Sequence, residues 1–419
     1  MNALGPPNDQ LTTELTQQVL ERCTSLSAIS SMNDAICRVY LSPEHQAANT
    51  IVLQWMREAG MTARVDAVGN VRGRYEGTDK NAPVLLLGSH LDTVPDAGAY
   101  DGILGVLLGI SAVAQLNASD TRLPFAIEVI GFGEEEGVRF GTTLMTSRAI
   151  AGSWQQDWWA LTDDAGLSVR TAFEQFQLNP DALTDARLSS AEVLAYVELH
   201  IEQGPVLEAA NLPLGVVTSI AGAKRLRVCI KGSAGHAGTT PMNLRRDALV
   251  AAARAVAFAE EVARQFEVVA TVGQIRCEPG GVNVIPGAAE FSLDIRSGND
   301  ATRDAALAEF ERELRADCKE RSLELEIEET HSASAVPCAP NLQHLFAAAL
   351  EDCDVAVTKL ASGAGHDAMA MAELCDVAML FIRSPGGISH NPAESVIPAD
   401  VALAHQVLLR FLHKLAHNR

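Results

Sequence analysis

The sequence predicts an α/β protein with a small α+β domain inserted into it, and three observations lead to this fold class. The chain has 419 residues, too many for one compact core, so two domains are expected. Apolar strand patterns alternate with helix patterns in 1–213 and again in 334–419, which is typical of an open α/β sheet. Between them, 214–333 combines helix patterns with strands that suggest antiparallel pairing. We therefore expect one discontinuous domain and one inserted domain.

The first segment of the discontinuous domain alternates helices and strands. Two amphipathic helices precede a hairpin, whose turn is the pair Gly69 and Asn70. The stretch "PVLLLGSH" is wholly apolar up to its end, like a strand covered on both faces in a parallel sheet. The expected elements are helix 9–29, helix 43–60, hairpin 62–77, strand 83–90, helix 102–117, strand 125–137 and strand 195–204.

The inserted segment predicts two helices on about four strands, which suggests a sandwich of ferredoxin-like type. Its first part, 214–235, is predicted to form two strands paired antiparallel. The elements expected after it are helix 245–266, strands in 268–280 and 288–298, helix 302–322 and strand 323–333. The α/β rhythm then returns with helix 341–353, strand 378–387 and helix 399–417.

Charge and composition exclude several classes of protein. The formal net charge of −21 argues against nucleic-acid binding, which requires a basic patch, but it does not exclude an anionic substrate. No stretch reaches the roughly 18 to 20 apolar residues of a membrane span, so no membrane association is expected. The N-terminus lacks the basic and apolar regions of a secretory signal. The eight cysteines are scattered, without a C-x-x-C pair, and indicate reduced thiols. We therefore expect a cytoplasmic protein.

Histidines and carboxylates gather where the predicted strands end. The carboxyl ends of parallel strands meet at one edge of a sheet, where ligands bind. The residues expected there are His90, Asp101, Glu134, Glu135, Glu136, His200 and His390. So many carboxylates would repel one another unless a cation held them. Histidine with Asp and Glu, and without cysteine, selects borderline divalent metals such as Zn, Mn or Co, and this set is large enough for two ions.

Each of these residues, taken singly, has an ordinary interpretation. A histidine at a strand end is usually a satisfied polar group, and an acidic run is usually a solvated turn. Asp96 keeps that interpretation as a solvated loop residue. Asp92 stands two positions after His90, on the same side of an extended segment, and can accept the second ring N–H. The G-x-G-x-x-A stretch in 362–368 is a weak dinucleotide match without the expected acidic partner.

Seven segments resemble the signature segments of the dinuclear M20-type amidohydrolases, in the branch that hydrolyses N-carbamoyl and ureido compounds. They are "GSHLDTV…DAGAYDGILGV", "GEEEGVRF", "VELHIEQGPVLE", "GSAGHAGTTPM", "NVIPGAAEFSLDIR", "SGAGHDA" and "GGISHNPAE". The resemblance covers essentially the whole chain, in order. It implies a mixed-sheet, metallopeptidase-like catalytic domain in 1–213 and 334–419, and a lid and dimerisation domain in 214–333. The family's peptidases carry Asp where His200 stands.

The resemblance implies two divalent ions, Zn or Mn, held by residues that match the family's motifs. One ion would be held by His90 and His200, the other by Glu136 and His390, and both by Asp101 as a bridge. It further implies that Glu135 is the general base and that Asp92 orients His90.

The resemblance also implies a set of substrate contacts and a homodimer formed through the inserted domain. The matching positions are Gln203, His236, Asn283, Arg296 and His366. Arg296 would clamp a substrate carboxylate, although by itself it would be a surface cation paired with a neighbouring acid. His236 would donate to the developing oxyanion in the partner subunit's active site. Closure of one domain on the other would complete the site, with hinges near residues 213 and 333.

Within the branch, "EEEGVRF" and "GVVTSIAGAKRL" are most similar to the allantoate amidohydrolases. The resemblance thus implies hydrolysis of the ureido group of allantoate, which gives ureidoglycine, ammonia and carbon dioxide in purine and allantoin nitrogen catabolism. The alternative is an N-carbamoyl-L-amino-acid hydrolase or β-ureidopropionase with the same machinery. His200 argues against a peptidase, and Glu135 argues against a non-catalytic metal-binding module.

Overall fold

The computed structural model describes residues 9–418, and the residues before them, which bear on the secretory-signal prediction, lie outside the described part. The described chain divides into two units. The first comprises the chain up to Thr218, Cys338–Leu360 and the chain from Ala364; the second comprises Ser219–Pro337 and Ala361–Gly363. These boundaries fall a few residues beyond 213 and 333, because the strand Leu214–Ile220 belongs to the sheet of the first unit.

A nine-stranded sheet, counted over the described residues, forms the centre of the first unit. Its order is β1-β2-β4-β3-β5-β16-β6-β14, with β15 beside β6. The strands β4, β3, β5 and β16 in the middle are parallel, and antiparallel strands flank them on both sides. The strands are β1 (Thr62–Val65), β2 (Val71–Tyr75), β3 (Val84–His90), β4 (Ile127–Phe132), β5 (Val193–Ile201), β6 (Leu214–Ile220), β14 (Val336–Pro337), β15 (Lys359–Ser362) and β16 (Val377–Ile382).

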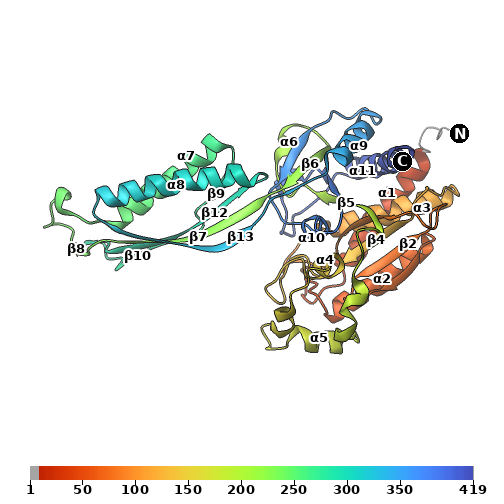
Figure 1. Ribbon diagram of the computed structural model, residues 1–419, viewed down its shortest axis with the longest axis horizontal. Helices are drawn as coiled ribbons and strands as arrows, with labels where there is room; N and C mark the ends of the chain where they lie inside the picture. The colour runs from red at the N-terminus through yellow and green to blue at the C-terminus, as the bar shows by residue number, and fades with distance from the viewer. Residues whose placement is uncertain (1–8, 419) are drawn as a thin grey trace. The chain divides into compact units, whose positions relative to one another are not determined.

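The middle strands are apolar along their whole length because protein covers both of their faces. Every residue of β3, β4 and β16 is buried. Helices α1, α3, α9 and α11 pack together over one face, and α10 contacts β5 and β16 (Figure 1). The helices of this unit are α1 (Asp9–Ser27), α2 (Pro43–Glu58), α3 (Ile103–Ala118), α4 (Met145–Ala151), α5 (Val169–Gln175), α6 (Val206–Ala209), α9 (Pro340–Glu351), α10 (Asp367–Met371) and α11 (Pro398–His417). The predicted α/β rhythm is confirmed.

The stretch between β4 and β5, for which the sequence predicted no element, forms a second small core. Its helices are α4, α5 and the 3₁₀ turns η1 (Gln156–Ala160) and η2 (Pro180–Ala186). Aromatic rings fill it, with Trp159 lying 4.8 Å from Trp154 and 4.9 Å from Phe173 between ring centroids. These helices span only five to seven residues, too few to display a helical period.

The second unit is a split β-α-β sandwich. Its four main strands lie in the order β10-β12-β7-β13, and all neighbouring pairs are antiparallel. β7 comes first of the four in the chain, yet it lies between β12 and β13, which come third and fourth. The short strand β9 also pairs with β12. Helices α7 and α8 cover one face (Figure 1), which confirms the predicted ferredoxin-like arrangement. The elements are β7 (Gly222–Lys231), β8 (Gly235–His236), η3 (Met242–Leu244), α7 (Ala248–Phe266), β9 (Val269–Thr271), β10 (Ile275–Glu278), β11 (Val284–Ile285), β12 (Ala288–Ser297), α8 (Asp300–Glu320) and β13 (Glu324–Ala333).

The prediction that 214–235 forms two strands paired with each other is wrong. β6 pairs with β16 in the large sheet, whereas β7 pairs with β12 and β13 in the small one. The chain passes from one sheet to the other at Ala221. Alternation of apolar and polar residues identifies a strand but not its partner, so the pattern could not reveal this.

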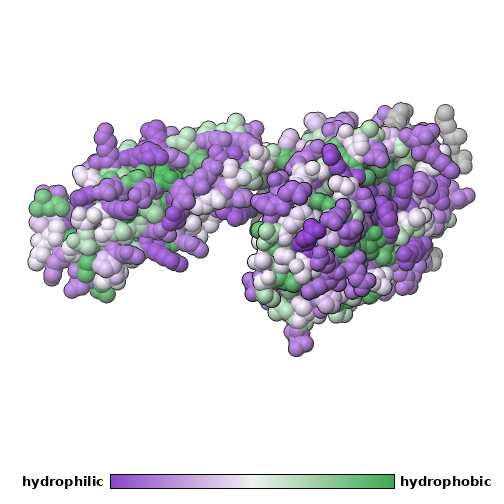
Figure 2. All heavy atoms as spheres, turned by 60° about the horizontal axis from the view of Figure 1, so that its bottom comes forward, coloured by the Kyte–Doolittle hydropathy of each residue, from purple (hydrophilic) through white to green (hydrophobic). Residues whose placement is uncertain are grey.

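The surface is rich in hydrophilic side chains. Much of the visible face of each unit is hydrophilic (Figure 2). No helix within residues 9–418 is both long enough and apolar enough to cross a membrane.

Candidate metal centre

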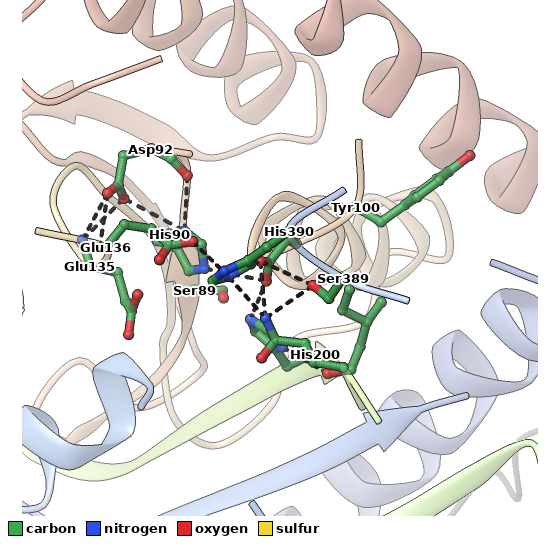
Figure 3. Close-up of polar contacts among 12 residues, drawn as sticks. Ser89, His90, Asp92, Tyr100, Glu135, Glu136, His200, Ser389 and His390 are labelled. Carbon is green, nitrogen blue, oxygen red and sulfur yellow. Dashed lines mark hydrogen bonds and ion pairs between the residues drawn. The ribbon is translucent and has the colours of Figure 1, made fainter. Parts of the chain in front are cut away.

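The predicted ligands of the first unit converge at the carboxyl edge of the parallel strands. His90 is the last residue of β3, His200 lies near the end of β5, and Glu135 and Glu136 follow β4. His390 comes from the loop after β16. Figure 3 shows the three imidazoles meeting at one point, with the two glutamates to one side.

Asp101 lies among the three histidines. Its Oδ1 atom is 3.2 Å from His200 Nε2 and 3.8 Å from His90 Nε2. Its Oδ2 atom is 3.1 Å from His390 Nε2, and that nitrogen is also 3.3 Å from Glu136 Oε1. One carboxylate thus faces two groups of ligands through its two oxygens, as a bridge would.

Hydrogen bonds on the far side of two rings determine which nitrogen faces Asp101. His90 Nδ1 lies 3.0 Å from the main-chain oxygen of Asp92, and His200 Nδ1 lies 2.8 Å from that of Ile201. Because a carbonyl only accepts, Nδ1 carries the proton and Nε2 presents its lone pair to Asp101. Gly102 makes the close approach of His90 possible, because a Cβ there would lie 2.4 Å from the ring.

Two buried polar atoms of this cluster lack a hydrogen-bond partner among the described residues, namely Asp101 Oδ1 and His200 Nε2. A lone pair facing a carboxylate oxygen is unfavourable unless a proton or a cation lies between them. Ligand atoms of His90, Asp101 and His200 lie within 4.8 Å of one another, and so do those of Asp101, Glu136 and His390. These two sets, which share Asp101, therefore fit a pair of divalent cations.

The pKa shifts in the metal-free cluster also indicate a site that binds positive charge. Burial alone would lower the pKa of His200, but Asp101 beside it raises that pKa above the ordinary value. Asp101 and Glu136 raise the pKa of His390 to about 10. Burial would raise the pKa of Asp101, yet His200 and His390 hold it well below its usual range. The carboxylates thus favour positive charge in this cluster, and when no metal is bound the protons on the histidines supply that charge.

Asp92 contacts both His90 and the glutamates. The main-chain oxygen of Asp92 receives the ring N–H, while its carboxylate lies 3.6 Å from the same nitrogen. The carboxylate accepts the main-chain N–H groups of Glu135 and Glu136, each at 3.1 Å. Sequence reasoning named only the contact with His90, because the two N–H donors lie more than 40 positions away. Asp96 is exposed, as expected.

Glu135 points into the cluster without facing Asp101, and the ligand atoms of His90, Glu135 and Glu136 also lie within 4.8 Å. Its side chain is buried, and burial raises the pKa of its carboxyl group well above the usual range. A buried carboxylate of raised pKa beside a metal site is suited to accept a proton.

Two predicted substrate residues of the first unit lie against the predicted ligands. Gln203 Nε2 donates to Asp101 Oδ2 at 3.0 Å and to Ser389 Oγ at 3.2 Å. His366 is buried, with its ring 4.5 Å from the ring of His200 between centroids. Burial lowers the pKa of His366 well below its ordinary value, so this imidazole is neutral.

The other predicted substrate residues belong to the second unit. His236 in β8 pairs with Val284 in β11, next to Asn283, whose main-chain oxygen accepts the N–H of Ala237 at 2.9 Å. His236 is exposed, and its Nδ1 accepts the N–H of Gly238 at 3.0 Å, which leaves the Nε2 proton free to be donated.

Arg296 forms the pair with a neighbouring acid that its residue type alone suggested. Its Nε and Nη2 atoms donate to the carboxylate of Asp294 at 2.8 and 3.1 Å. Its Nη1 atom donates to the main-chain oxygen of Gly363 at 2.9 Å.

Sequence reasoning missed three side chains that support the cluster. Glu198, wholly buried on β5, accepts from Ser89 Oγ at 2.9 Å and from the N–H of Ala368 at 3.0 Å. Ser389 and Glu394 stand on either side of His390, and both contact the loop that carries Asp101. The sequence offered one indication of Ser389 and Glu394, because both lie within four positions of the predicted ligand His390 in "ISHNPAE".

Comparison with known proteins agrees with the geometry of the site. The model of Peptidase family M20/M25/M40 matches residues 86–414. A probable allantoate deiminase of Oryza sativa subsp. japonica is 40% identical, over 96% of this chain and 89% of that protein. An N-carbamoyl-L-amino acid amidohydrolase of Geobacillus stearothermophilus is 39% identical, over 96% of this chain and 99% of that protein.

A crystal structure of an amidase of the hydantoinase/carbamoylase family from Burkholderia multivorans superimposes with a TM-score of 0.90, at 30% identity, over 96% of this chain and 98% of that one. The chain therefore belongs to Peptidase family M20/M25/M40, in its hydantoinase/carbamoylase branch, and is a hydrolase of carbon–nitrogen bonds other than peptide bonds.

Proposed function

We propose that the protein hydrolyses the ureido group of allantoate, giving ureidoglycine, ammonia and carbon dioxide. The observation that carries this proposal is the paired ligand set around Asp101, with the buried Glu135 beside it. The choice of allantoate is supported by four allantoate deiminases of plants, which are 38 to 40% identical to this chain over 96 to 97% of its length.

The ligand sets support two divalent ions, Zn or Mn, with His90 and His200 on one, Glu136 and His390 on the other, and Asp101 on both. When bound, such ions supply positive charge that acidifies a water molecule and polarises a carbonyl group. This chemistry suits a ureido carbonyl, which is a poor electrophile because two nitrogen atoms donate into it.

The chain's own groups would perform the proton transfers. Glu135 would accept the proton of the attacking water and return it to the leaving nitrogen, which departs as a neutral amine. His236 would donate its Nε2 proton in a hydrogen bond to the oxyanion. Gln203, Asn283 and His366 would supply further polar contacts to the substrate.

For Arg296 to clamp the substrate carboxylate, it would have to share its guanidinium with Asp294 or exchange that partner for the substrate.

An N-carbamoyl-L-amino-acid hydrolase is the second candidate. The Geobacillus stearothermophilus relative supports it, because it is 39% identical over 99% of its own length. Both reactions break the same ureido group, so the ligand cluster does not distinguish them.

Ammonia release from allantoate, compared with a panel of N-carbamoyl-L-amino acids, separates the two candidates. We expect the highest kcat/KM on allantoate. Turnover of the panel without turnover of allantoate would favour the second candidate, and hydrolysis of dipeptides alone would contradict both. A chelator-treated sample should be inactive on every substrate and regain activity with Mn²⁺ or Zn²⁺.

We further propose a homodimer that forms through the second unit. Large apolar side chains are exposed around the short β8–β11 pair, including Met242, Leu244 and Val282, which are 75%, 68% and 106% exposed. Hydrophobic residues are visible at the end of the smaller unit that carries β8 (Figures 1 and 2). Exposed apolar groups of this size are typical of an interaction surface, and His236 lies among them in β8.

A further inference from the structure

Glu394 is not a metal ligand, yet its carboxylate joins two of the segments that carry the ligands. We propose that Glu394 is a positioning residue of the metal centre, which fixes the loop bearing Asp101 against the segment bearing His390. The inference rests on the proposed pair of ions and is independent of the choice of substrate.

Three hydrogen bonds make this connection. Glu394 Oε1 accepts the main-chain N–H of Tyr100 at 2.9 Å and that of Asp101 at 3.1 Å. Glu394 Oε2 accepts the hydroxyl of Ser389 at 2.9 Å. The two N–H donors stand 294 and 293 positions away in the chain, so one side chain ties the loop before α3 to the loop after β16.

The carboxylate is enclosed by the loop that it holds. Glu394 is 6% exposed. A Cβ at position 98 would lie 2.2 Å from its carboxyl carbon, so glycine at that position lets the backbone close around it. A buried carboxylate is tolerated when donors surround it, and main-chain N–H groups then hold it in one place.

The hydroxyl of Ser389 extends the connection to the bridging side chain itself. Ser389 donates its single hydroxyl proton to Glu394 Oε2 at 2.9 Å, and its oxygen accepts from Gln203 Nε2 at 3.2 Å (Figure 3 shows Ser389 beside the cluster). The same amide nitrogen of Gln203 donates to Asp101 Oδ2 at 3.0 Å. Glu394 therefore acts on Asp101 by two routes, through the main chain and through Ser389 and Gln203. Because Asp101 faces both ligand sets, a shift of its carboxylate would alter both metal positions.

The surroundings of Glu394 allow its replacement without collapse of the fold. Tyr100 and Glu394 line a cavity of about 470 Å³. Water can enter a partly polar space of this size and solvate the freed N–H groups when the carboxylate is removed. We therefore expect the Glu394→Ala variant to fold, with a less constrained loop around Asp101.

The test measures Mn²⁺ binding to chelator-treated full-length protein, by titration and by electron paramagnetic resonance. In the wild type we expect two Mn²⁺ per chain and the spectrum of an exchange-coupled pair. The Glu394→Ala variant should bind Mn²⁺ about 10- to 100-fold more weakly and should show mainly the spectrum of uncoupled ions. In Glu394→Gln the amide oxygen can still accept the two N–H groups and the amide N–H can donate to Ser389, so affinity should return to within about threefold of the wild type.

Asp163→Ala is the matched control. The Asp163 carboxylate also accepts two main-chain N–H groups, from Ala165 and Leu167, and one side-chain donor, from Arg139, but none of these residues is a proposed ligand. Its Mn²⁺ affinity should equal that of the wild type, and thermal unfolding of each metal-free variant reports any general loss of stability.

Two results would overturn the inference: wild-type affinity in Glu394→Ala, or a loss in Glu394→Gln as large as that in Glu394→Ala. A wild-type protein that never shows a coupled Mn²⁺ pair would instead overturn the proposed dinuclear site, and the inference with it.

Discussion

At the residue scale, the metal centre depends on carboxylates that hold main-chain N–H groups. The Asp92 carboxylate accepts the N–H groups of Glu135 and Glu136, and thereby sets the directions of both glutamate side chains. Glu135 is held through its main chain, so its own carboxylate is available for proton transfer. A change of that carboxylate alone should therefore leave the rest of the cluster in place.

We expect Glu135→Gln to lower the rate of ureido hydrolysis by about 10²- to 10⁴-fold, because an amide cannot accept the proton from water. The main-chain contact with Asp92 is unchanged, so the variant should bind the same number of Mn²⁺ ions. Initial rates of ammonia release and metal analysis of the same sample check this. An unchanged rate would contradict the role of Glu135 as the base.

Much of the candidate site could be predicted at this scale, because apolar strands that end in histidine or acid can be recognised locally. His90, Glu135 and His200 all lie at or after such strand ends. The role of Glu394 could not be predicted, since it depends on contacts almost 300 positions away. The second role of Asp92 was missed for the same reason.

At the element scale, the packing of α11 against α3 contains a buried titratable group. His405 on α11 is 1% exposed, and burial lowers its pKa to about 4, against an ordinary value of 6.5. The unfolded chain therefore takes up a proton at this residue before the folded chain does. Stability should fall as the pH drops from about 6.5 toward 4, and His405 should have no effect on it above that range.

The pH dependence can be isolated with His405→Leu, which removes the titrating group. Between pH 7.5 and 5.0 the free energy of unfolding of metal-free wild type should decline by about 1 to 2 kcal/mol more than that of the variant, since a tenfold change in proton affinity corresponds to about 1.4 kcal/mol. Urea denaturation at both pH values measures the difference. His344→Leu, at an exposed site on α9, should behave as the wild type does.

The elements themselves were predictable where they are long. The periodicity of α7, α8 and α11, the long apolar stretch of α3 and the apolar runs of β3, β4 and β16 identified them. The short helices around Trp154 and Phe173 were not predicted. Which strands pair with each other was harder to predict. β6 and β7 are neighbours in sequence and belong to different sheets, because pairing is decided by tertiary packing and not by the strand pattern.

At the scale of the whole molecule, the proposed homodimer makes a prediction about mixed subunits. If His236 serves the active site of the partner subunit, Glu135→Gln and His236→Ala chains should each be nearly inactive alone. In a mixed dimer, one site combines an intact Glu135 with an intact His236 from the other chain. Co-refolded equal mixtures should then recover about a quarter of the wild-type activity, because half of the dimers are mixed and half of their sites are complete.

Ammonia release from the co-refolded mixture is the measurement, and sedimentation checks that dimers have formed. The two variants mixed without refolding are the control, because their subunits have not been exchanged. No recovery after exchange would contradict a shared active site, and a monomeric wild type would contradict the dimer itself.

The place of β16 in the large sheet has a consequence for how the protein is made. This strand lies between β5 and β6, yet it is translated after the whole second unit. On the ribosome, the second unit emerges as one nearly continuous stretch and can fold before β16 is made. Until then, the edges of β5 and β6 that pair with β16 remain without a partner strand. Exposed strand edges invite pairing with other chains. The nascent polypeptide is therefore expected to depend on chaperones in the interval before β16 leaves the exit tunnel.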